Sequence, residues 1–383
     1  YAAFVTAAAP LRSGYTWQQN RQLEALLSPG LTNTGVPQQA RERFAQLRAY
    51  LQQQGIAAQQ VMAATVWTTG DPTQPLRQGA QYVSTLPAAA PTDLRLLSEY
   101  PDYCIIEGSV QIPGFQKGIA PYLLVSGDIE WNASGEPVQQ YTRDGSFVVT
   151  IPKQTMPDSG YPLMMYNHGT GGDAIQVFTR GQEDAAGNLD IGGGPSRIAA
   201  SRGWASSGMG GHLSFDHLGI LGTLDGYIAY NFLNPVAWLG NMQQMVLERV
   251  YFRRFLNALR IPPHLCPGAD TADSFHFDTN RQVIMGHSLG SYLTGIQTAI
   301  DPEPYQGSIL SGAGGSWIEF AFGPTDPIHL QFFAELFALN LSPIEHMDLW
   351  HPIPMLAELL VGGANNILYT DRILRHPTKT PPH

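Results

Sequence analysis

The stretch RQVIMGHSLGSYLTG, residues 281–295, decides the fold. An apolar strand pattern leads into Gly286-His287-Ser288-Leu289-Gly290, and a helical pattern follows until Asp301-Pro302. A strand, a sharp turn and a helix together hold a serine in a strained, exposed position. The flanking glycines fit this geometry, because side chains there would collide with the neighbouring strand and helix. The alternative interpretation is a glycine-rich turn without chemistry.

A second glycine-rich segment lies upstream, where the strand-like run YPLMMYN precedes His168-Gly169-Thr170-Gly171-Gly172. Acyl transfer places negative charge on a carbonyl oxygen, and backbone N–H groups turned toward that oxygen stabilise it. We expect the N–H groups of Leu289 and of Gly169 or Thr170 to be these donors. Alone, such a loop also fits an ordinary turn after a strand. Paired with the serine turn, in this order, it indicates an acyl-transfer site.

From Cys104 onward strands and helices alternate, which is typical of a parallel sheet covered on both faces. The clearest helix is predicted at 241–260, with Arg249 and Arg253 off its apolar face and Pro262 ending it. The predicted fold class is therefore α/β, a mostly parallel sheet flanked by helices. The expected strands are 104–111, 121–130, 146–152, 162–168, 203–209, 281–287 and 306–312.

The two motifs resemble those of the α/β-hydrolase superfamily of serine esterases and lipases. The resemblance covers about residues 100–315 and implies that Ser288 is the nucleophile and that Leu289 with Gly169 or Thr170 forms the oxyanion hole. It implies no cofactor, and a small-molecule, lipid or polymeric ester as substrate. More distantly, the whole chain is similar to large exported bacterial hydrolases that carry an extra N-terminal region.

Four regions are expected along the chain. Strand and helix patterns at the start, at 16–28, at 38–54 and at 61–69 predict an accessory N-terminal region, which a linker at 87–93 ends. An aromatic segment after the core is either a cap over the site or a packed insertion. The regions are 1–100, accessory; 101–314, α/β-hydrolase core; 315–365, helical cap or insertion; and 366–383, an incomplete C-terminal part of the core that contains a strand-like run at 366–374.

The catalytic histidine and acid have no clear place in the sequence. A serine needs a histidine to take its proton, and a carboxylate orients that histidine. Either both lie in a C-terminal segment outside this chain, which we favour, or His346 or His351 works with Asp326 or Asp348. A C-terminal fragment of the same precursor is then an expected partner. The full set of internal candidates is Asp326, Asp348, Asp371, His329, His346, His351 and His376.

Three further histidines, His168, His287 and His212, are candidate substrate-pocket residues. The segment 208–219 contains His212, Asp216 and His217, which either bind substrate or a metal or, as we favour, form local hydrogen bonds. His346 and His351 are five residues apart and do not share a helical face, so we expect no metal site there.

Composition excludes several classes of protein. The balance of 21 Lys+Arg against 31 Asp+Glu gives a net charge of −10, so we expect no nucleic-acid binding. No apolar run approaches the length of a membrane span, and the first residues lack the pattern of a signal peptide. Because the chain begins at Tyr1 rather than Met, we expect a processed or excised product.

The two cysteines, Cys104 and Cys266, either form one disulfide, as in an exported protein, or remain buried thiols. We expect a secreted, periplasmic or cell-envelope location. Three functions stay open. The first is a serine hydrolase that cleaves carboxylic esters, the second is an acyltransferase or peptidase on the same machinery, and the third is a non-catalytic binding protein on a hydrolase scaffold.

Overall fold

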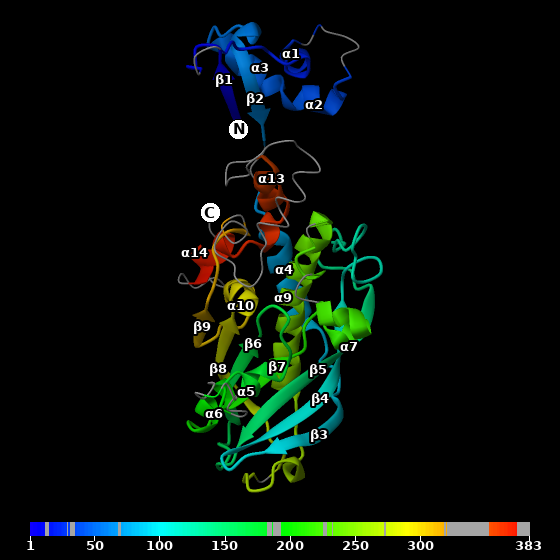
Figure 1. The fold of residues 1–383 in the computed structure, drawn as a ribbon, viewed down its shortest axis with the longest axis vertical. Coiled ribbons are helices and arrows are strands. Elements are labelled where there is room, and N and C mark those ends of the chain that lie inside the picture. The colour runs from blue at the N-terminus through cyan, green and yellow to red at the C-terminus, as the bar shows by residue number, and fades with distance from the viewer. Residues whose placement is uncertain are drawn as a thin grey trace. The chain divides into compact units, whose positions relative to one another are not determined.

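Two compact units, Tyr1–Asp71 and Pro72–His383, make up the chain in the computed structural model. Figure 1 shows the elements of both units. The structure describes residues 1–11, 15–28, 30, 35–67, 70–181, 186, 193–224, 228–231, 233–271, 273–317, 319 and 352–373.

The N-terminal unit is a two-stranded antiparallel sheet with short helices, drawn in blue in Figure 1. Leu23, Leu27, Leu47, Leu51 and Val61 form its small buried core. The strand and helix patterns predicted for this region are confirmed. Its elements are β1 (Ala2–Thr6), α1 (Arg21–Leu27), α2 (Gln38–Arg43), α3 (Ala45–Gln53), η1 (Ala58–Gln60) and β2 (Val61–Val66).

A seven-stranded sheet in the order β3-β4-β5-β7-β6-β8-β9 forms the centre of the second unit. Strands β3 and β5 run against the others, and β7, β6, β8 and β9 pair in parallel. The predicted α/β class with a mostly parallel sheet is therefore confirmed. The strands are β3 (Thr92–Glu99), β4 (Tyr103–Gly114), β5 (Tyr141–Pro152), β6 (Tyr161–Asn167), β7 (Ala205–Met209), β8 (Phe277–His287) and β9 (Gly307–Ser311).

Helices cover both faces of the sheet because the strands carry apolar side chains on both sides. Along β6, Leu163 and Met165 pack into the cluster that contains Phe252 of α9, whereas Met164 and Tyr166 pack on the opposite side. That opposite side is covered by α5 and α6. The helices of this unit are α4 (Gln74–Thr85), α5 (Gln176–Thr179), α6 (Pro195–Ala200), α7 (Phe215–Leu218), η2 (Gly219–Leu224), α9 (Pro235–Ala258), η3 (Pro263–Leu265) and α10 (Leu289–Ile300).

The central helix α9 differs from the prediction in its start and in its surroundings. It begins at Pro235, where the side chain of Asn234 accepts a hydrogen bond from the N–H of Ala237 at 3.3 Å. Because α4, α10 and the sheet all pack against it, nearly the whole helix is buried. Arg249 and Arg253, which we placed off the apolar face, are buried as well.

Two expected strands are wrong. Residues 121–130 form no strand, because Tyr122 and Ser126 adopt positive φ angles and Leu124 and Val125 point into solvent. The run 366–374 is helical as far as it is described, and Asn365 caps it by accepting from the N–H of Ile367 at 3.2 Å. The C-terminal elements are α13 (Pro352–Leu360), η4 (Gly362–Ala364), η5 (Asn366–Tyr369) and α14 (Thr370–Ile373).

The region boundary at residue 100 stays a prediction. Sequence reasoning missed α4 and β3 in the region that we expected to be accessory. β3 pairs with β4 of the main sheet, and α4 packs on α9. Most of the expected cap, 315–365, lies outside the described residues. Among the described helices, none is both long and apolar enough to cross a membrane.

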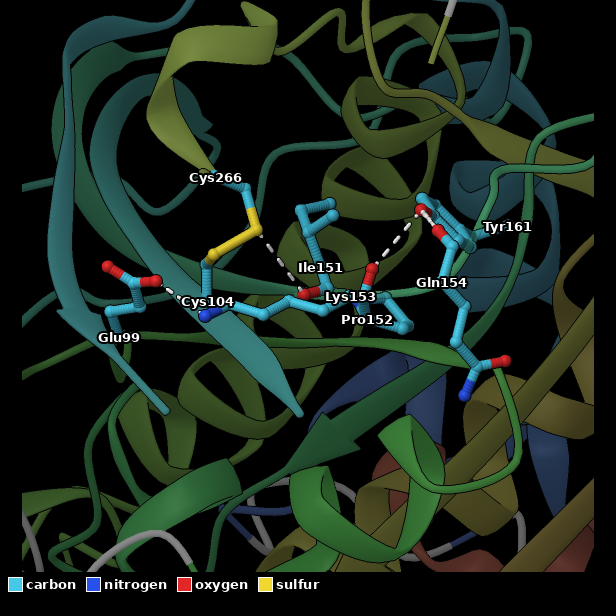
Figure 2. Close-up of a disulfide and its surroundings, with 8 residues drawn as sticks. All are labelled: Glu99, Cys104, Ile151, Pro152, Lys153, Gln154, Tyr161 and Cys266. Carbon is cyan, nitrogen blue, oxygen red and sulfur yellow. Dashed lines mark hydrogen bonds and ion pairs between the residues drawn. A yellow bond between two sulfur atoms is a disulfide. The ribbon is translucent and has the colours of Figure 1, made fainter. Parts of the chain in front are cut away.

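A disulfide joins Cys104 to Cys266 across 162 residues, which decides between the two alternatives for these cysteines. Cys104 lies on β4 and Cys266 follows η3, and both are fully buried. Figure 2 shows the bond beside the end of β5, where Lys153 pairs with Glu99 at 2.5 Å. By closing a long loop, the bond restricts the unfolded chain and stabilises the core around β4.

Candidate active site

Ser288 lies at the turn between β8 and α10, as the sequence predicts. Its backbone φ of 53° is a value that residues other than glycine rarely adopt, and its side chain is partly exposed. The Ser288 N–H donates to the carbonyl of Ser311, the last residue of the neighbouring strand β9, at 2.9 Å. Its own carbonyl accepts from the N–H groups of Ser291 and Tyr292 in the first turn of α10. The strained backbone is therefore held from both sides.

The glycines that flank Ser288 are required by close packing. A Cβ atom on Gly286 would lie 2.4 Å from the carbonyl oxygen of Gly290, and one on Gly290 would lie 2.1 Å from the carbonyl oxygen of Asn167. Both obstacles are backbone atoms, which cannot rotate away. Glycine at these two positions lets β8, α10 and the end of β6 meet behind the serine, as expected from the motif.

The loop after β6 packs directly against this turn. A Cβ on Gly169 would lie 3.0 Å from the Cβ of Ser288 and 3.1 Å from the carbonyl oxygen of His287. Leu289 opens α10, where helical N–H groups have no partner within the helix. The backbone of Gly169 and the start of α10 at Leu289 thus both lie next to Ser288.

Side-chain hydrogen bonds fix the loop in this position. Asn167, the last residue of β6, donates from Nδ2 to Oγ1 of Thr294 at 2.7 Å and to Oε1 of Gln297 at 3.2 Å. The Thr170 hydroxyl lies 2.7 Å from the hydroxyl of Tyr230. The loop is therefore tied to α10 on one side and to the segment before α9 on the other.

The candidate pocket histidines have different surroundings. His168 is buried; its Nδ1 donates to the carbonyl of its neighbour Gly169 at 2.8 Å, and its Nε2 has no hydrogen-bond partner. His287 is partly exposed and accepts at Nε2 from Arg180 at 2.6 Å. Burial, and the charge of Arg180, lower the pKa of His287. His168 therefore lies in the loop after β6 and His287 lies next to Ser288, and each has a pKa below its ordinary value.

His212 belongs to a buried network instead of an open pocket. Its Nδ1 donates to Oε1 of Glu248 at 2.8 Å, and its Nε2 lies 2.6 Å from Oε1 of Gln116. The other carboxylate oxygen of Glu248 accepts from Arg143 at 2.7 Å. Burial alone raises the pKa of Glu248, but Arg143 and His212 outweigh burial and bring it below its ordinary value. His217 bonds locally to the carbonyl of His212 at 2.7 Å.

Sequence reasoning missed Glu248, Gln116 and Arg143. The one available signal was Glu248, the one acidic residue of helix α9. Because Glu248 and Gln116 occupy both ring nitrogens of His212, this histidine is not free to take a proton from Ser288.

The described residues do not show a base beside Ser288. Within the described ranges no hydrogen bond joins its hydroxyl to a histidine, and no group of three His, Cys, Asp or Glu side chains is placed to hold a metal ion. The four residues favoured for an internal pair, His346, His351, Asp326 and Asp348, lie outside the described residues, as do His329 and His376. Asp371 is exposed in α14.

Acid is expected to destabilise the fold through His168. Burial and the nearby charge of Arg249 lower its pKa to about 4, below the ordinary value of about 6.5. The unfolded chain therefore binds a proton first, so stability is lost as the pH falls from about 6.5 to about 4, by about 3 kcal/mol. Urea unfolding at pH 7 and pH 4.5 measures this loss, which the His168→Asn variant should reduce.

The matched control is His264→Asn, since His264 is exposed. We expect this variant to lose as much free energy of unfolding between the two pH values as the unmodified protein. Equal losses in all three proteins would contradict the assignment to His168.

Comparisons with known proteins found no matching family model and no matching curated protein. Among solved structures, the acetyl xylan esterase from Paenibacillus sp. R4 is 12% identical with a TM-score of 0.45, over 81% of this chain and 78% of that one. Acetyl xylan esterase 1 from Thermoanaerobacterium sp. JW/SL YS485 is 11% identical with a TM-score of 0.42, over 79% and 75%. A glucuronoyl esterase from Solibacter usitatus is 13% identical with a TM-score of 0.32, over 65% and 59%.

These likenesses are distant, and none of them assigns a function to this chain. The fold follows from the chain's own topology. A mostly parallel sheet carries a glycine-flanked serine on the sharp turn between β8 and α10, and the loop after β6 lies against that serine. The second unit therefore has the α/β-hydrolase fold that the two sequence motifs predict.

Proposed function

We propose that this protein is a serine hydrolase that cleaves carboxylic esters through an acyl-enzyme on Ser288. One observation carries the proposal: Ser288 has a φ of 53° at the strand-to-helix turn, and the backbone of Gly169 packs against its Cβ. A binding protein has no need of a strained serine beside backbone donors. An ester hydrolase needs both, because the serine attacks and the donors stabilise the oxyanion.

In the proposed reaction the Ser288 oxygen forms a bond to the ester carbonyl carbon while its proton passes to a base. The carbonyl electron pair moves onto oxygen, where the N–H groups of Leu289 and of Gly169 or Thr170 stabilise the charge. When this tetrahedral intermediate breaks down, the carbonyl forms again and the bond to the alcohol oxygen breaks. The base returns its proton to that oxygen, and the alcohol leaves. Water then repeats the sequence, which releases the acid and restores Ser288. No cofactor takes part.

The histidine and carboxylate that complete this site are proposed to lie outside the described residues. The sequence candidates His346 or His351 with Asp326 or Asp348, and a C-terminal fragment of the same precursor, stay predictions. The proposed location is secreted, periplasmic or in the cell envelope, since disulfides such as Cys104–Cys266 persist in oxidising compartments.

The test uses p-nitrophenyl acetate, butyrate and octanoate with the purified protein. We expect turnover of at least one ester and a burst of nitrophenol equal to the protein concentration when deacylation is slow. The matched p-nitroanilides separate an esterase from a peptidase, and an added alcohol as acceptor separates it from an acyltransferase. No release above the buffer rate from any of them would support the non-catalytic alternative and contradict the proposal.

A further inference from the structure

Arg249 is a buried arginine that forms no ion pair with a described residue, although the charge of the adjacent Glu248 acts on it. It lies in the middle of α9 and is 4% exposed. Its Nη1 donates to the carbonyl of Met245 in the preceding turn at 2.8 Å, and its Nε has no hydrogen-bond partner among the described residues. No carboxylate of the described residues forms an ion pair with it. Burying a charge in this way is costly, so it calls for a compensating role.

The charged residues near Arg249 on α9 form ion pairs with other side chains. Glu248, the next residue along the chain, directs its carboxylate to Arg143 and His212 instead. Arg253, one turn further along α9, has its own buried partner, Asp301, at 3.2 Å. Of these three buried arginines, Arg249 is the one without an ion pair among the described residues.

Those surroundings are the oxyanion loop. Arg249 lines a small cavity of about 10 Å³ together with Leu289, Gly169 and Thr170, which carry the proposed N–H donors. A space of this size holds about one water molecule and leaves no room for a substrate group. His168 lines the same cavity, and its pKa is lowered by burial and by the charge of Arg249, so this histidine adds no second cation.

We infer that Arg249 is a positioning residue of the oxyanion hole, whose buried positive charge stabilises the negative charge formed on the substrate carbonyl oxygen. This inference rests on the proposed ester hydrolysis at Ser288. The guanidinium is buried and shares a cavity with Leu289 and Gly169, so its field is weakly screened there. The substrate itself is neutral at the carbonyl. The charge therefore favours the transition state over bound substrate and raises kcat without changing KM.

The experiment measures Arg249→Met and Arg249→Gln against the unmodified protein. Both variants remove the charge, and Gln keeps a polar group if Met prevents folding. With p-nitrophenyl butyrate we expect kcat to fall about 10- to 100-fold with KM unchanged. An alkylboronic acid, which adds to a serine hydroxyl as a tetrahedral anion, should bind more weakly by the same factor. Arg249→Lys, which keeps a charge, should restore part of the loss in both measurements.

The matched control is Arg253→Met on the same helix, which removes a buried charge that does not line the cavity. We expect it to lower the thermal unfolding temperature while kcat and boronate affinity stay near those of the unmodified protein. Folded Arg249 variants with unchanged kcat and unchanged boronate affinity would overturn the inference. An unmodified protein without esterase activity would overturn the proposed function, and this inference with it.

Discussion

Replacing Ser288 by alanine is expected to lower kcat for ester hydrolysis by about 10⁴-fold or more. The nucleophilic oxygen disappears, whereas the Cβ that packs against Gly169 stays, so the turn between β8 and α10 should keep its geometry. Steady-state hydrolysis of p-nitrophenyl butyrate measures the effect, and circular dichroism checks that the variant is folded.

Ser291→Ala is the matched control for this change. Ser291 lies in the first turn of α10, is fully buried, and its hydroxyl has no hydrogen-bond partner in the described structure. The same substitution there should leave kcat within a few-fold of the unmodified protein. A Ser288→Ala variant that retained most of its activity would show that another group attacks the ester.

Replacing Glu248 by glutamine is expected to lower the free energy of unfolding by about 3–5 kcal/mol. Glu248 is fully buried and accepts from both Arg143, at 2.7 Å, and His212, at 2.8 Å. Without the Glu248 charge, the buried guanidinium of Arg143 loses the carboxylate that pairs with it, in an interior that solvates a charge poorly. Urea unfolding at pH 7 measures the loss.

Glu107→Gln provides the comparison at the surface. The ion pair between Glu107 and Arg95 has a similar length, 2.6 Å, but its arginine side chain is 68% exposed. Exposed pairs contribute about 0–1 kcal/mol, so this variant should stay close to the unmodified protein. Similar losses for the two variants would refute the assignment of a special role to the buried network.

The position of Ser288 was predictable from sequence because its geometry is specified locally. The residues that set it, Gly286 and Gly290, each lie two residues from Ser288 in the chain, and a side chain at either would collide with backbone atoms. The alternation of strands and helices likewise predicts most of the sheet. Sequence reasoning missed β3 and α4. For α4 a signal was present, since its buried residues Leu76, Ala80 and Val83 follow a helical spacing.

Arg249 and Glu248 could not be placed from sequence, because their surroundings come from distant segments. Helical periodicity assumes one apolar face, whereas α9 is enclosed by the sheet, α4 and α10 together. The predicted strand at 121–130 is wrong because the apolar run Leu123-Leu124-Val125 is exposed rather than buried. Its apolar side chains resemble those of a buried strand, yet positive φ angles at Tyr122 and Ser126 turn the chain out of the sheet.

Treatment of the unmodified protein with a fluorophosphonate, followed by mass spectrometry of the adduct, shows whether Ser288 is a reactive nucleophile. We expect one adduct per chain, on the peptide that contains Ser288, and no adduct in the Ser288→Ala variant. An unreactive protein, or an adduct on another residue with Ser288 unmodified, would contradict this expectation.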